Sequence, residues 1–157
     1  MGNKLVAAER AATGRRPASM DGTQIVGLRT YIVEDNATIR ENLIGTLEEL
    51  TPVKAVGVAE TESEGKSWLI HNSAEWDLAI VDLFLRQGSG LGVIEACRNR
   101  DPSQKVVVLS NYATQDMRRR CEQLGADAVF DKSNEIEALV EYCVTQFPEL
   151  GPGKLTP

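Results

Sequence analysis

From about residue 28 onward, short apolar runs alternate with segments of helical periodicity, and this alternation limits the possible folds more than any other feature. Such alternation is typical of successive strand–helix units, which build a mostly parallel sheet. The expected strands are Leu28–Val33, Val53–Ala59, Asp77–Val81, Lys105–Leu109 and Ala126–Phe130. Several of them are apolar on both faces, as strands buried between two helical layers must be. The sequence therefore predicts an α/β fold with an open parallel sheet.

Helices are expected in the gaps between these strands and after the last one. The clearest comes last, where apolar residues recur at three- and four-residue spacing from Ile136 to Phe147. Asn134 and Glu137 are expected to form a capping box at its start, and Pro148 to stop it. The other helices are expected over the apolar stripe Ile39, Leu43, Leu47 and Leu50, and over about 62–71, 90–100 and 114–124.

The chain has 157 residues, which fits one domain with a substantial core. We expect this domain over 27–148, with a flexible basic arm at 1–26 and a flexible tail at 149–157. A net charge of −6 and a pI near 4.9 argue against nucleic acid as the main partner. Because few residues follow Lys132, no DNA-binding output domain is expected within the chain.

The cysteines are Cys97, Cys121 and Cys143, and all three lie inside amphipathic helical patterns. Their odd number and placement argue against a disulfide framework and favour a reducing compartment. No stretch approaches the roughly 18 apolar residues of a membrane helix, and the start lacks the apolar run of a secretory signal. We therefore expect a cytoplasmic protein without a membrane partner.

Polar residues stand where the expected strands end, which is where ligands bind in open parallel α/β sheets. These residues are Glu34, Asp35, Asp82, Ser110 and Lys132. Three carboxylates in one crevice would repel one another, so a cation is implied. Oxygen ligands alone suit Mg²⁺, and the chain offers no histidine and cysteine cluster for zinc. The single histidine, His71, is expected at a helix end away from the crevice.

Asp82 is the best candidate for a nucleophile. With its charge balanced by a metal, a carboxylate can attack a phosphoryl donor and form an acyl phosphate. Asp82 ends the central apolar run and precedes a glycine-bearing loop at 86–90, which lets the backbone approach a bound group closely. Ser110 can donate to a phosphoryl oxygen. Lys132 can pair with the carboxylates before modification and with the phosphoryl group afterwards.

These motifs together resemble those of the bacterial two-component response regulator receiver domain, over roughly residues 28–147. The matching segments, in order, are Val33-Glu34-Asp35-Asn36, Ile80-Val81-Asp82-Leu83, Val108-Leu109-Ser110 and Gly125-Ala126-Asp127-Ala128-Val129-Phe130-Asp131-Lys132-Ser133. The resemblance implies a CheY-like, flavodoxin-like fold. Such a fold is a doubly wound sheet of five parallel strands in the order 2-1-3-4-5, flanked by five helices.

The resemblance also implies roles for individual residues. Asp82 would be the phosphoacceptor and Asp35 a direct Mg²⁺ ligand, with Glu34 acting through water and the backbone carbonyl of Phe84 completing the protein ligands. A sensor histidine kinase or phosphotransfer protein would donate the phosphoryl group. The output would be another protein, bound at the fourth helix, fifth strand and fifth helix, and a homodimer stays open. The chain would be a signalling switch and not a turnover enzyme.

Some positions depart from the usual pattern of this family. Glu34 replaces an aspartate, which lengthens one acidic side chain but keeps its charge. Ser133 replaces the proline that usually follows the lysine, so a cis peptide is not expected there. Val129 stands where the family's switch aromatic usually lies, and strand alternation should point Phe130 to the other face. Tyr112 is a substitute candidate for a moving aromatic, with plain packing as the alternative.

Three other functional classes share features with this sequence. A phosphatase or dehalogenase-like hydrolase also uses a nucleophilic aspartate, but usually has a second acid two residues later, where this chain has Phe84. A flavodoxin-like electron carrier needs a hydroxyl-rich phosphate loop, and Glu34 with Asp35 would repel a phosphate. A degenerate receiver that acts only as a docking module is the third alternative. The intact set of Asp82, Ser110 and Lys132 weighs against it.

Three further features have structural interpretations that we favour. Gly88–Gly92 follows the third strand instead of the first, so it is interpreted as a loop and not as a nucleotide-binding motif. Arg118–Arg120 is interpreted as the solvated face of a helix, not as a site for an acidic partner. Trp68 and Trp76 are interpreted as packing residues and not as stacking platforms for bases.

Overall fold

The computed structural model describes residues 27–147. The expected arm at 1–26, the expected tail and the expected helix stop at Pro148 lie outside the described residues. The strands are β1 Leu28–Val33, β2 Val53–Ala59, β3 Leu78–Val81, β4 Lys105–Ser110 and β5 Ala128–Asp131. The helices are α2 Ala37–Leu50, α3 Glu62–His71, α4 Gly90–Ala96, α5 Gln115–Leu124 and α6 Ile136–Thr145.

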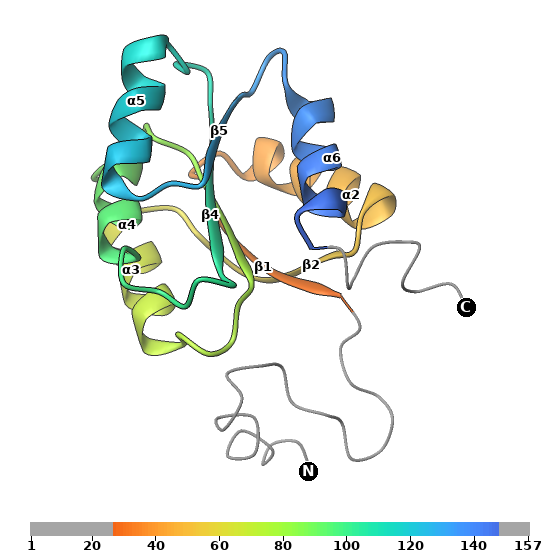
Figure 1. The fold of residues 1–157 in the computed structure, drawn as a ribbon, viewed down its shortest axis with the longest axis horizontal. Coiled ribbons are helices and arrows are strands. Elements are labelled where there is room, and N and C mark those ends of the chain that lie inside the picture. Colours follow the sequence, from red (N-terminus) through yellow and green to blue (C-terminus); the bar gives the residue numbers. More distant parts are fainter. Residues whose placement is uncertain (1–26, 148–157) are drawn as a thin grey trace.

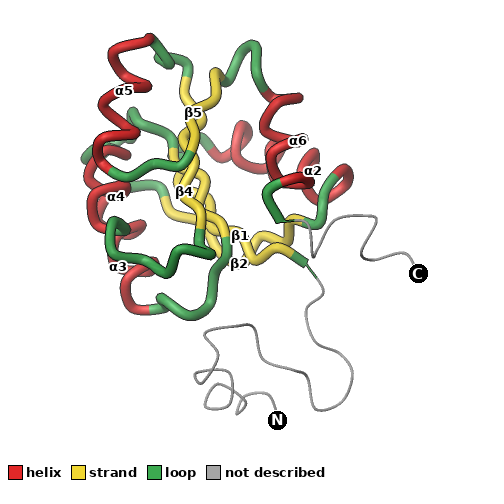
Figure 2. The backbone as a smooth tube through the Cα atoms, viewed as in Figure 1, coloured by secondary structure: helices red, strands yellow, loops and turns green. Residues whose placement is uncertain are grey.

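The five strands form one sheet in the order β2-β1-β3-β4-β5, and every neighbouring pair is parallel. Helices α2 and α6 cover one face of this sheet, and α3, α4 and α5 cover the other (Figure 1). Figure 2 shows the sheet as the middle of three layers. The doubly wound fold and the strand order implied by the sequence motifs are therefore confirmed.

A hydrophobic core lies on each face of the sheet, because the strands alternate their side chains between two helical layers. The core on the α3, α4 and α5 side includes Tyr31, Trp76, Val81, Val108 and Val129. The core on the α2 and α6 side includes Leu28, Ile32, Leu47, Phe130 and Leu139. Every residue of β1 is buried. As predicted, Val129 and Phe130 point to opposite faces.

Hydrogen bonds near the strand ends shift the starts of two strands. β3 begins one residue later than expected and β5 two residues later. The carboxylate of Asp77 accepts the backbone N–H of Arg29 at 2.8 Å, which anchors the residue before β3 to the start of β1. The N–H of Ala126 donates to the carbonyl of Cys121, so this residue closes α5 instead of starting β5. Gly125, the C-cap of α5, has a φ of 115° that suits glycine.

The predicted capping box at the last helix is wrong. The N-cap of α6 is Glu135, which makes no side-chain capping hydrogen bond. The carboxylate of Asp131 instead accepts the N–H groups of Ser133 and Asn134. The α4 helix is also shorter than the expected range, because the chain tightens to three-residue turns after Ala96. The other four helices are capped by the side chains of Asn36, Thr61, Ser89 and Thr114.

Several smaller predictions are confirmed by the packing. All three cysteines are free and buried. Trp76 is buried and its indole N–H donates to the carbonyl of Leu69 at 3.3 Å, while Trp68 stacks on Tyr31 with ring centroids 4.2 Å apart. His71 ends α3 and contacts Ser67 on its own helix. No helix in the described part of the chain combines the length and apolarity needed to cross a bilayer.

Candidate functional site

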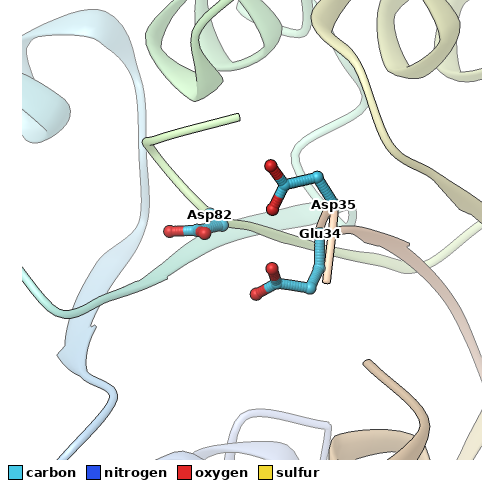
Figure 3. Close-up of side chains that lie close together, drawn as sticks. All are labelled: Glu34, Asp35 and Asp82. Atoms are coloured by element: carbon cyan, nitrogen blue, oxygen red, sulfur yellow. The ribbon is translucent and has the colours of Figure 1, made fainter. Parts of the chain in front are cut away.

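An acidic pocket forms where two neighbouring strands end. Glu34 and Asp35 come directly after β1, and Asp82 comes directly after β3. The last residues of these strands, Val33 and Val81, are paired in register, so the acids that follow lie side by side. Each of the three side chains offers a carboxylate oxygen within 4.8 Å of the others. Figure 3 shows the three carboxylates gathered around one space.

The pocket places charge where water has little access. Glu34 and Asp82 are buried, and Asp35 is half-buried. Burial raises the pKa of Asp82 above its ordinary value, and the charge of Glu34 adds to this, while Lys132 works in the opposite direction. Burial therefore favours the protonated, neutral form of the Asp82 carboxylate. A cation that enters the pocket would therefore stabilise the ionised carboxylates.

Lys132 provides the cation of the pocket. Its ammonium nitrogen lies 2.7 Å from Oε1 of Glu34 and 3.3 Å from Oδ2 of Asp82. Burial lowers the pKa of Lys132, but hydrogen bonds and charge from the two carboxylates outweigh this and leave the pKa raised. The lysine is therefore charged at neutral pH. It joins the residue after β5 to the residues after β1 and β3.

The two oxygens of Glu34 are both engaged. Oε1 accepts from Lys132, and Oε2 accepts the backbone N–H of Asn36 at 3.0 Å. The longer side chain of glutamate thus reaches the lysine while staying tied to its own loop. Asp35 has no comparable partner among the described residues. This arrangement leaves Asp35 and Asp82 as the acids best placed to offer oxygens to a metal ion, whose preferred ligands are such oxygens when the metal is Mg²⁺.

Ser110 stands at the end of β4, fully buried. Its hydroxyl oxygen accepts the N–H of Tyr112 at 3.2 Å, which leaves its O–H to donate. Its backbone carbonyl accepts the N–H of Lys132 at 3.0 Å. The serine and the lysine are thereby fixed next to each other at the carboxyl end of the sheet.

An aromatic pair belongs to the loops that follow β3 and β4. Phe84 and Tyr112 pack edge to face with ring centroids 4.6 Å apart. Both remain largely exposed, at 52% and 59%. Tyr112 therefore packs on Phe84, and its role as a moving aromatic stays a prediction. Among the described residues every peptide bond is trans, so the peptide after Lys132 is trans as expected.

The glycines after Asp82 are explained by close packing. Gly88 has a φ of 85°. A Cβ on Gly90 would lie 2.2 Å from the carbonyl oxygen of Asp82. The carboxylate of Glu62 accepts the N–H of Ser89 at 2.9 Å and holds this loop against α3. The glycines thus serve the turn that carries Asp82, in line with the loop interpretation.

Two arginines that bind segments next to the site residues were not found by sequence reasoning. Arg40 donates to the backbone carbonyl of Glu34 at 2.8 Å and also pairs with Glu60. Arg118 was assigned to a solvated face, yet its guanidinium binds the carbonyl of Val129 and the carboxylate of Glu135. Helical periodicity places both on polar faces and cannot reveal which backbone they reach.

Comparisons with known proteins point to one family. A family model described as the response regulator receiver domain matches residues 30–143. The virulence transcriptional regulatory protein PhoP of Salmonella typhimurium is 35% identical over 115 residues, which cover 72% of this chain and 49% of PhoP. The photosynthetic apparatus regulatory protein RegA of Rhodobacter capsulatus is 46% identical over 55 residues, which cover 35% of this chain and 29% of RegA.

Solved structures share the fold. The CheX–CheY–BeF3–Mg complex from Borrelia burgdorferi matches with a TM-score of 0.69 at 14% identity, over 81% of this chain and 92% of the matched chain. A signal receiver domain from Vibrio parahaemolyticus matches with a TM-score of 0.67 at 18% identity, over 79% and 92% of the two chains. The curated relatives are longer, since the match spans 29% to 49% of RegA and PhoP.

Proposed function

The chain belongs to the response regulator receiver domain family, a signalling module of two-component systems and not a turnover enzyme, and we propose that it accepts a phosphoryl group on Asp82. The observation that carries this proposal is the position of Lys132. Its ammonium group lies between the carboxylates of Glu34 and Asp82. Asp35 and Ser110 stand at the carboxyl ends of strands in the same sheet. An acid and a cation thus lie beside the Asp82 carboxylate, and Ser110 ends the neighbouring strand β4.

The chemistry is an attack by a carboxylate oxygen of Asp82 on the phosphorus of a donor. A bond forms between that oxygen and phosphorus, and the bond from phosphorus to the donor's leaving atom breaks, with its electron pair staying on the donor. The product is an acyl phosphate. Attack requires the ionised carboxylate, and the charge of Lys132 opposes the burial that would keep Asp82 protonated.

Mg²⁺ fits the pocket because the donor set consists of carboxylate oxygens with one lysine to balance them. Asp35 and Asp82 would hold the ion directly, with the backbone carbonyl of Phe84 as a third protein ligand and Glu34 acting through water. Its positive charge would balance the acids and the oxygens of the incoming phosphoryl group. The chain's own residues then position the donor and the product.

After transfer, Lys132 and Ser110 act on the product. The lysine exchanges part of its pairing with carboxylate oxygens for a phosphoryl oxygen, and the serine hydroxyl donates to another. Both residues follow or end a strand, so a shift toward Asp82 moves the loops attached to β4 and β5. Only interactions that differ between the two states can bias the chain's conformation, typically by about 1 to 3 kcal/mol.

The partners belong to the same proposal. A sensor histidine kinase or a phosphotransfer protein would donate the phosphoryl group, and another protein would bind the modified chain, in the cytoplasm. The curated relatives are named as regulatory proteins, and one matched structure is named as a complex with BeF3 and Mg. A docking role without phosphorylation has no observation in its favour.

Beryllofluoride with Mg²⁺ offers a test that needs no partner. We expect it to shift the backbone amide resonances of Asp82, Ser110 and Lys132 in the wild-type chain, because it mimics a phosphoryl group on the carboxylate. Asp82→Asn should show none of these shifts. Asp116→Asn is the matched control, since it changes an exposed aspartate on α5. Equal shifts in the Asp82 variant would overturn the assignment.

Magnesium binding gives a second, independent check. Asp35→Ala should weaken Mg²⁺ binding about tenfold or more, because it removes an oxygen ligand from a pocket with few alternatives. Calorimetry or the quenching of tryptophan fluorescence would measure the dissociation constant. Asp116→Ala serves as the control. An unchanged dissociation constant in Asp35→Ala would count against the acidic pair as the metal site.

A further inference from the structure

Arg118 makes an unusual set of contacts for a residue on the polar side of a helix. Its Nε donates to the carbonyl of Ala113 at 2.9 Å, and one terminal nitrogen donates to the carbonyl of Val129 at 2.9 Å. The other terminal nitrogen pairs with Oε1 of Glu135 at 2.9 Å. All three nitrogens of the guanidinium are therefore used. Each binds a different segment of the chain.

The segments that Arg118 joins are those that carry two residues of the pocket. Ala113 lies three residues after Ser110, in the loop from β4 to α5. Val129 lies three residues before Lys132, and Glu135 three residues after it. The guanidinium thus binds the chain before and after Lys132, and it also binds the loop that follows Ser110. A movement of either loop would therefore change this contact set.

Glu135 ties the contact set to the backbone next to Lys132. Its Oε1 accepts the N–H of Asp131 at 2.7 Å in addition to Arg118, and its own N–H donates to the carbonyl of Asp131 at 2.8 Å. These hydrogen bonds lower the pKa of Glu135, with the bond from Arg118 as the largest cause. Glu135 is therefore charged at neutral pH and closes a tight loop around the lysine.

The position of β5 explains how one side chain can reach so far. β5 is an edge strand of the sheet. Helices α5 and α6 lie on opposite faces beside it (Figure 1). Arg118 on α5 can therefore bind a carbonyl of the edge strand and continue to Glu135, which precedes α6. A lysine could not make the same set of bonds, because it offers one nitrogen and lacks the fork of donors.

We propose that Arg118 and Glu135 are positioning residues for the phosphoacceptor pocket, holding the loops that place Ser110 and Lys132 against Asp82. This inference rests on the proposed function. Neither residue touches the reacting atoms. Arg118 and Glu135 keep about one-third of their side-chain surface exposed, at 33% and 38%, so a partner at α5 and α6 can reach the same contact set. Coupling between two such sites is reciprocal.

The test uses the full chain, acetyl phosphate and Mg²⁺, and compares Arg118→Lys, Glu135→Ala and Glu135→Gln. We expect the rate constant of phosphorylation to fall about fivefold or more in Arg118→Lys and Glu135→Ala, a coupling within the usual range. Glu135→Gln keeps an acceptor oxygen and should recover part of the rate. The dissociation constant for Mg²⁺ should stay within about twofold, because the contact set does not include the acidic pocket.

Arg119→Lys is the matched control. Arg119 is the next residue on the same helix, is mostly exposed and, within the described part of the chain, pairs locally with Asp116. It should leave both the rate constant and Mg²⁺ binding unchanged. Circular dichroism gives the folded fraction of each variant, and rate constants are expressed per folded chain. Amide resonances of Ser110 and Lys132 should shift in Arg118→Lys and not in Arg119→Lys.

Two results would overturn the inference. One is a rate constant for Arg118→Lys and Glu135→Ala that equals that of Arg119→Lys. The other is a loss of rate that a parallel loss of Mg²⁺ affinity accounts for, which would mean a general disturbance of the pocket. Failure of the proposed function looks different, since the wild-type chain itself would then take up no phosphoryl group.

Discussion

At the scale of single residues, Asp82 is a carboxylate that the folded chain holds at a cost. It is buried beside Glu34 and is compensated by one lysine. Burial raises its pKa above the ordinary 3.8. Residues that carry function often sit in such unfavourable settings, because the features that tune their reactivity also lower stability. The cost at Asp82 can be measured.

Replacing Asp82 with asparagine should therefore stabilise the fold at neutral pH, by on the order of 1 kcal/mol, because a desolvated charge is removed. The folded wild type binds a proton more tightly than the unfolded chain, so its penalty develops as pH rises from 3.8 through the raised pKa of Asp82. The advantage of Asp82→Asn should shrink as pH falls toward 3.8. Urea unfolding at several pH values measures both effects.

A variant that is equally stable at neutral pH, or an advantage that does not change with pH, would contradict this account.

Lys132 supplies a comparison within the same pocket. Its pKa is raised, so its contribution to stability is present below 10.5 and is lost only as pH rises through that higher value. Titration of the lysine therefore does not confuse measurements made between pH 3 and pH 8.

The sequence was sufficient to find the pocket residues but not all their supports. Glu34, Asp82 and Lys132 could be predicted because they end or follow strands, and parallel strands bring their carboxyl ends to one edge. Arg118 could not, because its partners are two backbone carbonyls and a glutamate that only the folded chain brings together. Periodicity reports which face a residue occupies and not what it contacts.

At the scale of elements, the starts of the helices show a clear division. Four of the helices in the described chain begin at a side chain that accepts a backbone N–H, whereas α6 begins at Glu135 without one. The side chain of Glu135 is committed to Arg118 and to the N–H of Asp131 instead. At the start of α6, the contact of Glu135 with Arg118 therefore takes the place of the usual side-chain cap. This explains why the predicted capping box failed.

Thr114→Ala and Asn134→Ala test this division directly. Thr114 accepts the N–H of Met117 at 3.2 Å as the cap of α5, so its loss should cost about 1 kcal/mol of unfolding free energy. The side chain of Asn134 does not cap α6, so its loss should change that free energy by less than about 0.5 kcal/mol. Urea unfolding of the two variants side by side gives the comparison. An equal or larger cost for Asn134→Ala would restore the capping box.

Strand starts follow the same logic. Asp77 was assigned to β3 from its place before an apolar run, but its carboxylate is bound to Arg29. Two residues before β5, Ala126 completes the turn that ends α5. Apolar patterning predicts that a strand exists and roughly where. The polar contacts that fix its first residue are not visible in this patterning, since Asp77 binds a residue distant in the sequence and Ala126 binds the end of the preceding helix.

At the scale of the whole molecule, one sheet is shared by two cores. The strands contribute alternate residues to each core, so neither layer can loosen without disturbing the sheet. Both tryptophans pack on the α3, α4 and α5 side, and Leu139 lies fully buried on the other. Tryptophan fluorescence therefore reports on one core while a mutation can be made in the other.

Leu139→Ala should lower the free energy of unfolding by about 2 to 5 kcal/mol. If the two cores unfold as one unit, tryptophan fluorescence and far-ultraviolet circular dichroism will give the same urea midpoint in the variant, as in the wild type. Separate midpoints would show that the α2 and α6 layer unfolds by itself. That result would contradict a single cooperative domain over the described residues.

We propose that the carboxyl ends of β1, β3, β4 and β5 form a phosphoacceptor site with Asp82 as the acceptor. Incubation with acetyl phosphate and Mg²⁺, followed by intact mass and peptide mapping, tests it most directly. We predict one added phosphoryl group, located on Asp82, in the wild type and in Asp116→Asn, and none in Asp82→Asn. The same added mass in Asp82→Asn, or a modification mapped to another residue in the wild type, would contradict the account.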